Sequence, residues 1–155
     1  PDLYHQQPLE DPYAIVAGWK TRLQLYPPPL QKALLDKHLG SLRYWRHDYH
    51  YANKVQRQDV VFLAGLSVKL VHDLIQVLFA LNESYYVGDG YNLAYLARLP
   101  LQPPDLANRL QAILYPPSSA AMFAEQRNGL LALIDEVEQL ATAHGYAVDR
   151  WMGLA

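Results

Sequence analysis

The stretch Val60–Leu81 constrains the fold most, because it is long enough for a helix of six turns and apolar almost all the way round. Such a helix either crosses a membrane or lies at the centre of a helical bundle. It is interrupted by Lys69, His72, Asp73 and Gln76. Each charged group would cost roughly 2.5–3.5 kcal/mol at bilayer depth. The sequence therefore predicts a core helix here and no membrane span.

Proline and glycine divide the rest of the chain into helical lengths, and no segment alternates between polar and apolar residues as a strand does. We expect Asp11-Pro12 to start the first helix and Asp59 to cap the central one. Gly40-Ser41 is expected to end one helix and start the next. The other helices are expected over about 12–25, 30–39, 42–57, 91–99, 104–114 and 121–144. The fold predicted is all-α: a single helical bundle of about six to seven helices around the central apolar helix, one domain over residues 1–155.

Composition and charge exclude several classes of protein. The net charge of -2 gives no strong signal for nucleic acid or for an anionic membrane. Cysteine is absent, which excludes disulfides and thiolate chemistry and suits a reducing cytoplasm. The chain starts PDLYHQQP, with neither Met nor a signal peptide. We expect a cytoplasmic protein and a fragment, such as the C-terminal half of a longer chain.

The polar residues of the central helix form one narrow stripe at helical spacing, in which Gly65 precedes Lys69, His72, Asp73 and Gln76. This stripe faces either open water or a ligand in a cavity. Lys69 and Asp73 are four residues apart and can pair on the helix surface. Both interpretations stay open from the sequence alone.

A second set of polar residues lies in the segment 43–50. Arg43 and His50 fit the loose Arg-x(4–6)-His spacing of HEPN-type ribonucleases, in which Arg and His act on the scissile phosphate. His47 and His50 could start a metal site, but no third ligand is evident, so no metal site is predicted. The alternative is that Trp45 and Tyr49 dock this helix and the His side chains point outward.

Motifs that would supply chemistry by themselves are missing from the sequence. There is no phosphate-binding Gly-rich loop, no nucleophile elbow and no zinc-protease motif. The Gly88-Asp89-Gly90 turn lacks the further acidic ligands of a calcium loop. No catalytic residue is therefore assigned in this chain, and a plain helical interaction module is one hypothesis for its function.

Several short segments of the chain together carry a resemblance to a known family: Leu3-Tyr4, Gly18-Trp19, Tyr26-Pro27, Leu30, Arg57-Gln58-Asp59, Val77–Asn82 and Leu99-Pro100. The most specific piece is the Leu-Phe-Ala-Leu-Asn sequence that ends at Asn82 and precedes a glycine loop. These segments resemble the C-terminal helical part of bacterial nucleotidyltransferase-like proteins, and the resemblance covers roughly residues 2–115. That family carries a domain-of-unknown-function label and is related to the aminoglycoside-type nucleotidyltransferases.

The resemblance implies a divided active site. In such proteins an N-terminal α/β half carries a Gly-Ser turn and an Asp-x-Asp pair, which binds Mg²⁺ for transfer from a nucleoside triphosphate. This chain matches neither motif, so Mg²⁺ and the nucleotide are implied only for a full-length parent, and no cofactor is implied here. The chain resembles the substrate-side half, which shapes the cleft for a small-molecule acceptor and self-associates. Its expected partners are an N-terminal nucleotidyltransferase domain or a second copy.

Four positions carry over from the family, without a role that the match itself defines: Arg57, Asp59, Asn82 and Gly88. Together with the stripe residues Lys69, His72, Asp73 and Gln76, they are the candidate substrate-binding residues. Arg57 and Asp59 are also explained by a helix cap with an ion pair. One departure is that family members tend to carry Lys after the glycine, where this chain has Asp89. The departure predicts weaker or different phosphate binding.

Overall fold

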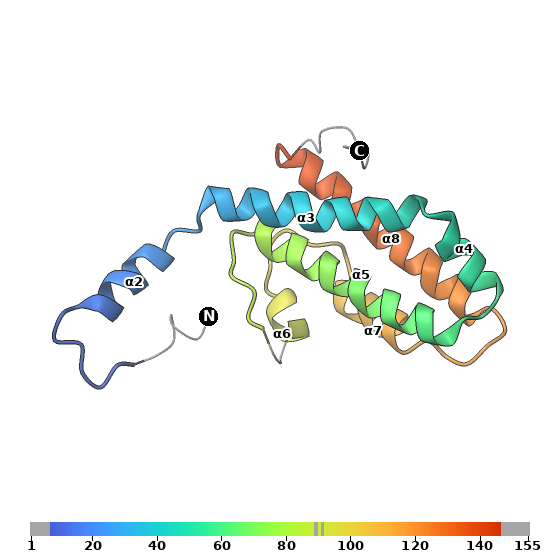
Figure 1. Ribbon diagram of the computed structural model, residues 1–155, viewed down its shortest axis with the longest axis horizontal. Coiled ribbons are helices and arrows are strands. Elements are labelled where there is room, and N and C mark those ends of the chain that lie inside the picture. The colour runs from blue at the N-terminus through green and yellow to red at the C-terminus, as the bar shows by residue number, and fades with distance from the viewer. Residues whose placement is uncertain (1–6, 89, 91, 147–155) are drawn as a thin grey trace.

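The computed structural model describes residues 7–88, 90 and 92–146, and within them it has seven helices and no strand. The long helix α5 lies at the centre, and five other helices pack on it (Figure 1). This confirms the predicted all-α fold around a central apolar helix. The helices are α2 (Ile15–Leu23), α3 (Pro28–His47), α4 (Tyr49–Gln56), α5 (Val60–Leu81), α6 (Asn92–Leu96), α7 (Leu106–Leu114) and α8 (Met122–Ala143).

The burial of α5 follows from its composition. By length and composition α5 is the one helix of the described part that could cross a membrane. In the fold, however, 14 of its 22 residues are buried, including every residue from Asp73 to Leu81. The neighbours α3, α8, α7, α4 and α6 supply the covering side chains. The arrangement is that of a core helix, because an all-round apolar surface is covered by protein on several sides.

The α3 helix corrects the expected break at Gly40-Ser41. It runs without interruption from Pro28 to His47, so it joins the helix predicted over 30–39 to the first part of the helix predicted over 42–57. Its leucines Leu35, Leu39 and Leu42 are buried on both sides of the glycine. A glycine inside a helix costs only about 1 kcal/mol, which the burial of these three side chains outweighs.

The real break in this region comes at Asp48, which the sequence pattern did not indicate. Asp48 has an extended backbone, and its side chain accepts a hydrogen bond from the backbone N–H of His50 at 2.5 Å. It therefore serves as the N-cap of α4. At the next junction, Asp59 accepts a hydrogen bond from the N–H of Phe62, and this confirms the predicted cap of α5.

The N-terminal helix α2 is shorter than the predicted range of about 12–25, and it does not pack into the core. Asp11 accepts hydrogen bonds from the N–H groups of Ile15 and Ala17, but the helix begins only at Ile15, since Ala14 takes a left-handed conformation. No residue of α2 is buried, and Ile15 and Trp19 are each 50% exposed. Figure 1 shows α2 standing apart from the bundle, beyond the start of α3. Its apolar face does not belong to the core.

The C-terminal half follows the predicted order more closely. Helix α8 has nearly the expected bounds, and α6 is shorter than predicted. Helix α7 begins at Leu106 instead of Pro104, because Asp105 has a positive φ of 53°. Leu3-Tyr4 of the resemblance lies outside the described residues.

Candidate functional site

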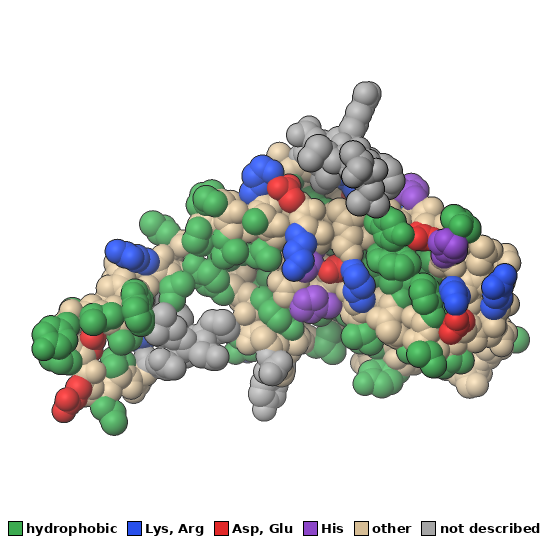
Figure 2. Space-filling model, viewed as in Figure 1, with side chains coloured by type: hydrophobic (Ala, Val, Ile, Leu, Met, Phe, Trp, Pro, Cys, Tyr) green, Lys and Arg blue, Asp and Glu red, His purple; other side chains and the backbone are tan. Residues whose placement is uncertain are grey.

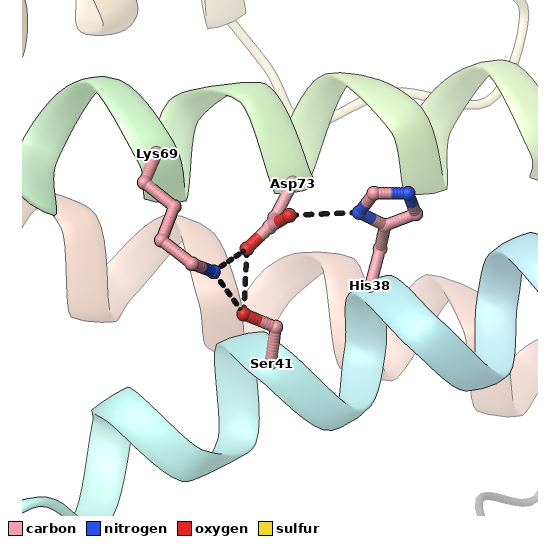
Figure 3. Close-up of polar contacts among 4 residues, drawn as sticks. All are labelled: His38, Ser41, Lys69 and Asp73. Atoms are coloured by element: carbon pink, nitrogen blue, oxygen red, sulfur yellow. Dashed lines mark hydrogen bonds and ion pairs between the residues drawn. The ribbon is translucent and has the colours of Figure 1, made fainter.

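The polar stripe of α5 meets two polar residues of α3, and together they form one hydrogen-bonded group (Figure 3). His38 Nδ1 lies 2.7 Å from Asp73 Oδ1, and Ser41 Oγ donates to Asp73 Oδ2, also at 2.7 Å. Lys69 Nζ is 2.7 Å from the same Oδ2 and donates a second hydrogen bond to Ser41 Oγ. We call His38, Ser41, Lys69 and Asp73 the α3–α5 cluster.

One side of the cluster is buried in the protein, and the other side is exposed to solvent. Asp73 and His38 are buried, Ser41 is half-buried, and the Lys69 side chain is 47% exposed. Burial raises the pKa of Asp73, but hydrogen bonds from Lys69, Ser41 and His38, with the Lys69 charge, together bring that pKa below its ordinary value. Asp73 is therefore a carboxylate at neutral pH, whose buried charge is paired and hydrogen-bonded.

This carboxylate fixes the orientation of the His38 ring. An ionised carboxylate only accepts hydrogen bonds, so Nδ1 of His38 must carry the hydrogen in their shared bond. In the neutral imidazole the other nitrogen, Nε2, then has a free lone pair. In Figure 3 this nitrogen points away from Asp73.

Around the cluster the stripe divides into exposed and buried members. His72 is exposed, and its ring centroid lies 6.0 Å from that of His38 and 5.7 Å from that of Tyr86. Gln76 is buried further along α5 and takes no part in the cluster. Figure 2 shows Lys, Arg and His side chains gathered with a little acidic surface over the junction of α3 and α5. The stripe is thus neither a plain solvated face nor the lining of an enclosed cavity.

Acid is expected to weaken the fold through Asp73. Because its pKa is lower in the folded state than in the unfolded chain, its contribution is complete above about pH 4 and disappears as the pH falls through the folded-state pKa. Urea unfolding of the wild type at pH 6 and pH 3 should show a loss of stability on acidification. Asp73→Asn, measured in the same way, should show a smaller loss. An equal loss in both proteins would contradict the assignment.

The carried-over positions lie at the two ends of α5, and the structure does not bring them together. Arg57 is exposed just after α4, and Asp59 caps α5 and pairs with Lys54 at 2.6 Å. Asp59 therefore acts as the helix cap that the cap-and-ion-pair interpretation expects, but its ion pair is with Lys54 and not with Arg57. Asn82 and Gly88 follow the other end of α5, roughly 33 Å away along a helix of this length. Asp89, which stands where the family tends to have Lys, lies outside the described residues.

Asn82 holds the loop after α6 against the end of α5. Its Nδ2 donates to the carbonyls of Leu78 and Leu101 at 2.7 and 2.8 Å, and its Oδ1 accepts from the N–H of Leu101 at 2.9 Å. These three hydrogen bonds explain an asparagine at this position by structure alone, because one side chain joins two backbone segments.

Loss of this side chain is expected to be costly. Asn82→Ala should lower the free energy of unfolding by about 2 kcal/mol, since three hydrogen bonds to a half-buried backbone are lost. Ser84→Ala removes one hydrogen bond, to the Asn82 carbonyl, and should cost less than half as much. Chemical denaturation of both variants measures the difference. Equal effects would show that Asn82 does not hold the loop.

The ribonuclease pattern gains no support from the geometry. Arg43 lies in α3 and donates from Nε to Glu138 Oε1 of α8 at 2.9 Å. His50 lies in α4, beyond the break at Asp48, with its ring 3.9 Å from that of Tyr49. Within the described ranges, no group of three or more His, Asp or Glu side chains is placed to hold a metal ion.

The residues of the cluster also do not suit Mg²⁺. Its only carboxylate is Asp73, and both of its oxygens are occupied by His38, Ser41 and Lys69. A magnesium site needs free oxygen ligands, and an adjacent ammonium group repels the ion. No step of metal-assisted transfer is therefore derived from this chain.

Two features of the structure could not be predicted from the sequence: the part of α3 in the cluster, and a cavity. His38 and Ser41 lie 35 and 32 positions before Asp73, and the expected break at Gly40-Ser41 concealed their common helix face. The second feature is a cavity of about 490 Å³, which lies between the C-terminal end of α2, the C-terminal end of α5, and α6. Its lining includes Tyr26, Phe79, Tyr85, Tyr95 and Arg98.

Comparison with known proteins places the chain in a family. The model of a family described as a domain of unknown function (DUF4037) matches residues 6–89, more than half of the chain. The match spans α2 to α5 and contains all four residues of the α3–α5 cluster. No curated protein and no solved structure matches the chain. The chain belongs to the DUF4037 family.

Proposed function

We propose that this chain is the helical, substrate-side and self-association domain of a nucleotidyltransferase-like protein, and that it transfers nothing by itself. The family match, over residues 6–89, lies within the region of roughly 2–115 that resembles nucleotidyltransferase-like proteins. In this proposal the metal, the nucleoside triphosphate and the catalytic carboxylates belong to a separate α/β half in the cytoplasm. The helical chain contributes the surface that receives the acceptor.

The α3–α5 cluster is the observation that carries this proposal. It places a half-exposed ammonium group, Lys69, and an exposed imidazole, His72, on the seam between two long helices. The buried Asp73 accepts a hydrogen bond from Lys69, so the orientation of the ammonium group is already fixed in the absence of a ligand. A fixed donor beside open surface suits the positioning of a polar acceptor, whereas a merely solvated lysine would need no buried carboxylate.

The test is release of pyrophosphate from nucleoside triphosphates and Mg²⁺. The chain alone should give no release above a protein-free control. The complete product of the reading frame that encodes it should release pyrophosphate when an acceptor is supplied, and deletion of the helical part should abolish this. Release by the chain alone, or transfer that is unchanged without it, would overturn the proposal.

Self-association is supported by α2. Its face of Ile15 and Trp19 is half-exposed although each side chain is large and apolar, and a nine-residue helix is marginal in water without a partner surface. We expect analytical ultracentrifugation to show a dimer of the chain and to show a weaker one for Trp19→Ser. A wild type that stays monomeric at every concentration tested would contradict this part of the proposal.

A further inference from the structure

We propose that the cavity at the C-terminal end of α5 binds an aromatic α-amino acid as a zwitterion, with its carboxylate on Arg98 and its ammonium group beside Glu83. The cavity has a volume of about 490 Å³, within the usual range of ligand sites, roughly 300–1,000 Å³. No residue of the α3–α5 cluster lines it. The inference goes beyond the proposed function, because binding in this cavity requires neither a transfer reaction nor a second half of the protein.

The first argument is that two opposite charges line this cavity without pairing. They are Glu83, which follows α5, and Arg98, which follows α6, and both are exposed. Among the described residues no ion pair joins either of them to the other or to a third group. Two opposite charges that share a cavity without meeting leave space for a ligand that carries both. An α-amino acid has this pattern, because its ammonium and carboxylate groups are bonded to one carbon.

The second argument is that both the backbone and the charge of Glu83 are unfavourable where it stands. It follows the C-cap of α5 with a φ of 50°, a left-handed conformation that glycine usually takes at the end of a helix. Its N–H donates to the carbonyl of Ala80 at 3.1 Å and so closes the helix. Its carboxylate lies at the negative end of the helix dipole, and the last turn of α5 has no basic residue. A bound ammonium group would be attracted by both the carboxylate and the helix end.

The third argument is the orientation of Arg98. Its guanidinium carbon lies 5.9 Å from the centroid of the Tyr95 ring, a distance typical of a cation–π contact. Within the described part of the chain, no side-chain hydrogen bond of Arg98 to another residue is present. The contact therefore orients the planar group and leaves its N–H donors free. A carboxylate is the anion whose two oxygens match this fork of donors.

The fourth argument is the wall of the cavity, which is largely aromatic and apolar. Tyr26, Tyr85 and Tyr95 line it, together with Phe79, which is 4% exposed. The rings of Tyr26 and Tyr85 have centroids 4.9 Å apart and planes inclined by 54°. Such rings favour contact with a further aromatic ring, in an offset or an edge-to-face arrangement. An apolar wall with a few polar groups is the usual make-up of a small-ligand site, and here it suits an aromatic side chain.

Isothermal titration calorimetry of the folded chain with L-phenylalanine tests this inference. The account predicts saturable one-to-one binding. Two analogues separate the charges of the ligand: 2-phenylethylamine lacks the carboxylate, and 3-phenylpropionate lacks the ammonium group. Each analogue should bind about tenfold more weakly than L-phenylalanine, because a charge-assisted interaction is lost.

Two variants separate the charges of the protein. Arg98→Gln should weaken the binding of L-phenylalanine and of 3-phenylpropionate about tenfold and leave that of 2-phenylethylamine unchanged. Glu83→Gln should weaken the binding of L-phenylalanine and of 2-phenylethylamine and leave that of 3-phenylpropionate unchanged. Lys37→Gln removes an exposed positive charge of α3 outside the cavity and should change none of these affinities.

The absence of saturable binding of L-phenylalanine at millimolar concentration would overturn the inference. Analogues that bind the wild type as tightly as L-phenylalanine, or an equal effect of Arg98→Gln on all three ligands, would also overturn it. Both replaced side chains are exposed, so the circular dichroism and the urea midpoint of the variants should match those of the wild type. No nucleotide takes part in this experiment, so its result is independent of the pyrophosphate test of the proposed function.

Discussion

Replacing Asp73 with alanine is expected to lower the free energy of unfolding by about 3 kcal/mol. The carboxylate is buried and receives hydrogen bonds from His38, Ser41 and Lys69. Without it, the buried His38 keeps an N–H that no acceptor meets, and an unmet buried donor carries its full desolvation cost. Lys69 can turn to water, so the loss should stay at the lower end of what a broken buried ion pair costs.

The ion pair of Glu136 with Arg109 supplies the control. It joins α8 to α7 through two hydrogen bonds of 2.7 and 2.8 Å, but both side chains are about a third exposed. Glu136→Ala should therefore cost no more than about 1 kcal/mol. Urea unfolding of both variants at neutral pH decides the comparison. Equal losses would show that burial does not set the cluster apart from an ordinary surface pair.

Replacing Leu74 with alanine is expected to cost about 3 kcal/mol, with a range of about 2–5 kcal/mol for such changes. Leu74 is 1% exposed, in the fully buried half of α5, where neighbouring helices leave little room for the site to collapse. The substitution removes buried methyl groups and leaves a cavity. The effect should appear as a lower urea midpoint with an unchanged slope.

Val68→Ala is the matched control on the same helix. Val68 is 62% exposed, and alanine favours helix at least as well as valine does. Its effect should stay within about 0.5 kcal/mol of the wild type. A large effect of Val68→Ala would indicate that the exposed side of α5 is covered by a partner, for example in a dimer.

The parts of the fold that could be predicted are those governed by local chemistry. The apolar run of α5 and the cap at Asp59 gave the correct bounds of the central helix, because periodicity and capping act within a few residues. The turn at Gly145, which has a positive φ of 84°, ends α8 close to the predicted position. In these places local preference and tertiary packing agree.

The errors arose where packing outweighs local preference. Gly40-Ser41 has the pattern of a helix end, yet the leucines on both sides of it keep α3 continuous on α5. Helix α2 has large apolar side chains such as Ile15 and Trp19, but no residue of this helix is buried. Periodicity shows which face of a helix is apolar and does not show what covers it.

The candidate site could be predicted only in part, for the same reason. The stripe placed Lys69 and Asp73 on one side of α5, four residues apart, and the structure joins them at 2.7 Å. Their partners His38 and Ser41 depend on how α3 crosses α5, a relation that spacing within one helix cannot provide. Only the resemblance points to Arg57 and Asn82 as site residues, and the structure explains Asn82 by its bonds to Leu78 and Leu101.

In the proposed function, this helical domain presents the α3–α5 cluster to the acceptor while another half of the protein holds the nucleotide. The most direct measurement is steady-state nucleotidyl transfer by the complete protein, with acceptor and nucleotide varied separately, for Lys69→Met and for the exposed control Lys37→Met on α3. The account predicts that Lys69→Met lowers kcat/KM for the acceptor about tenfold and leaves the KM for the nucleotide unchanged, with Lys37→Met like the wild type. A kcat/KM for the acceptor that Lys69→Met leaves intact would contradict the claim.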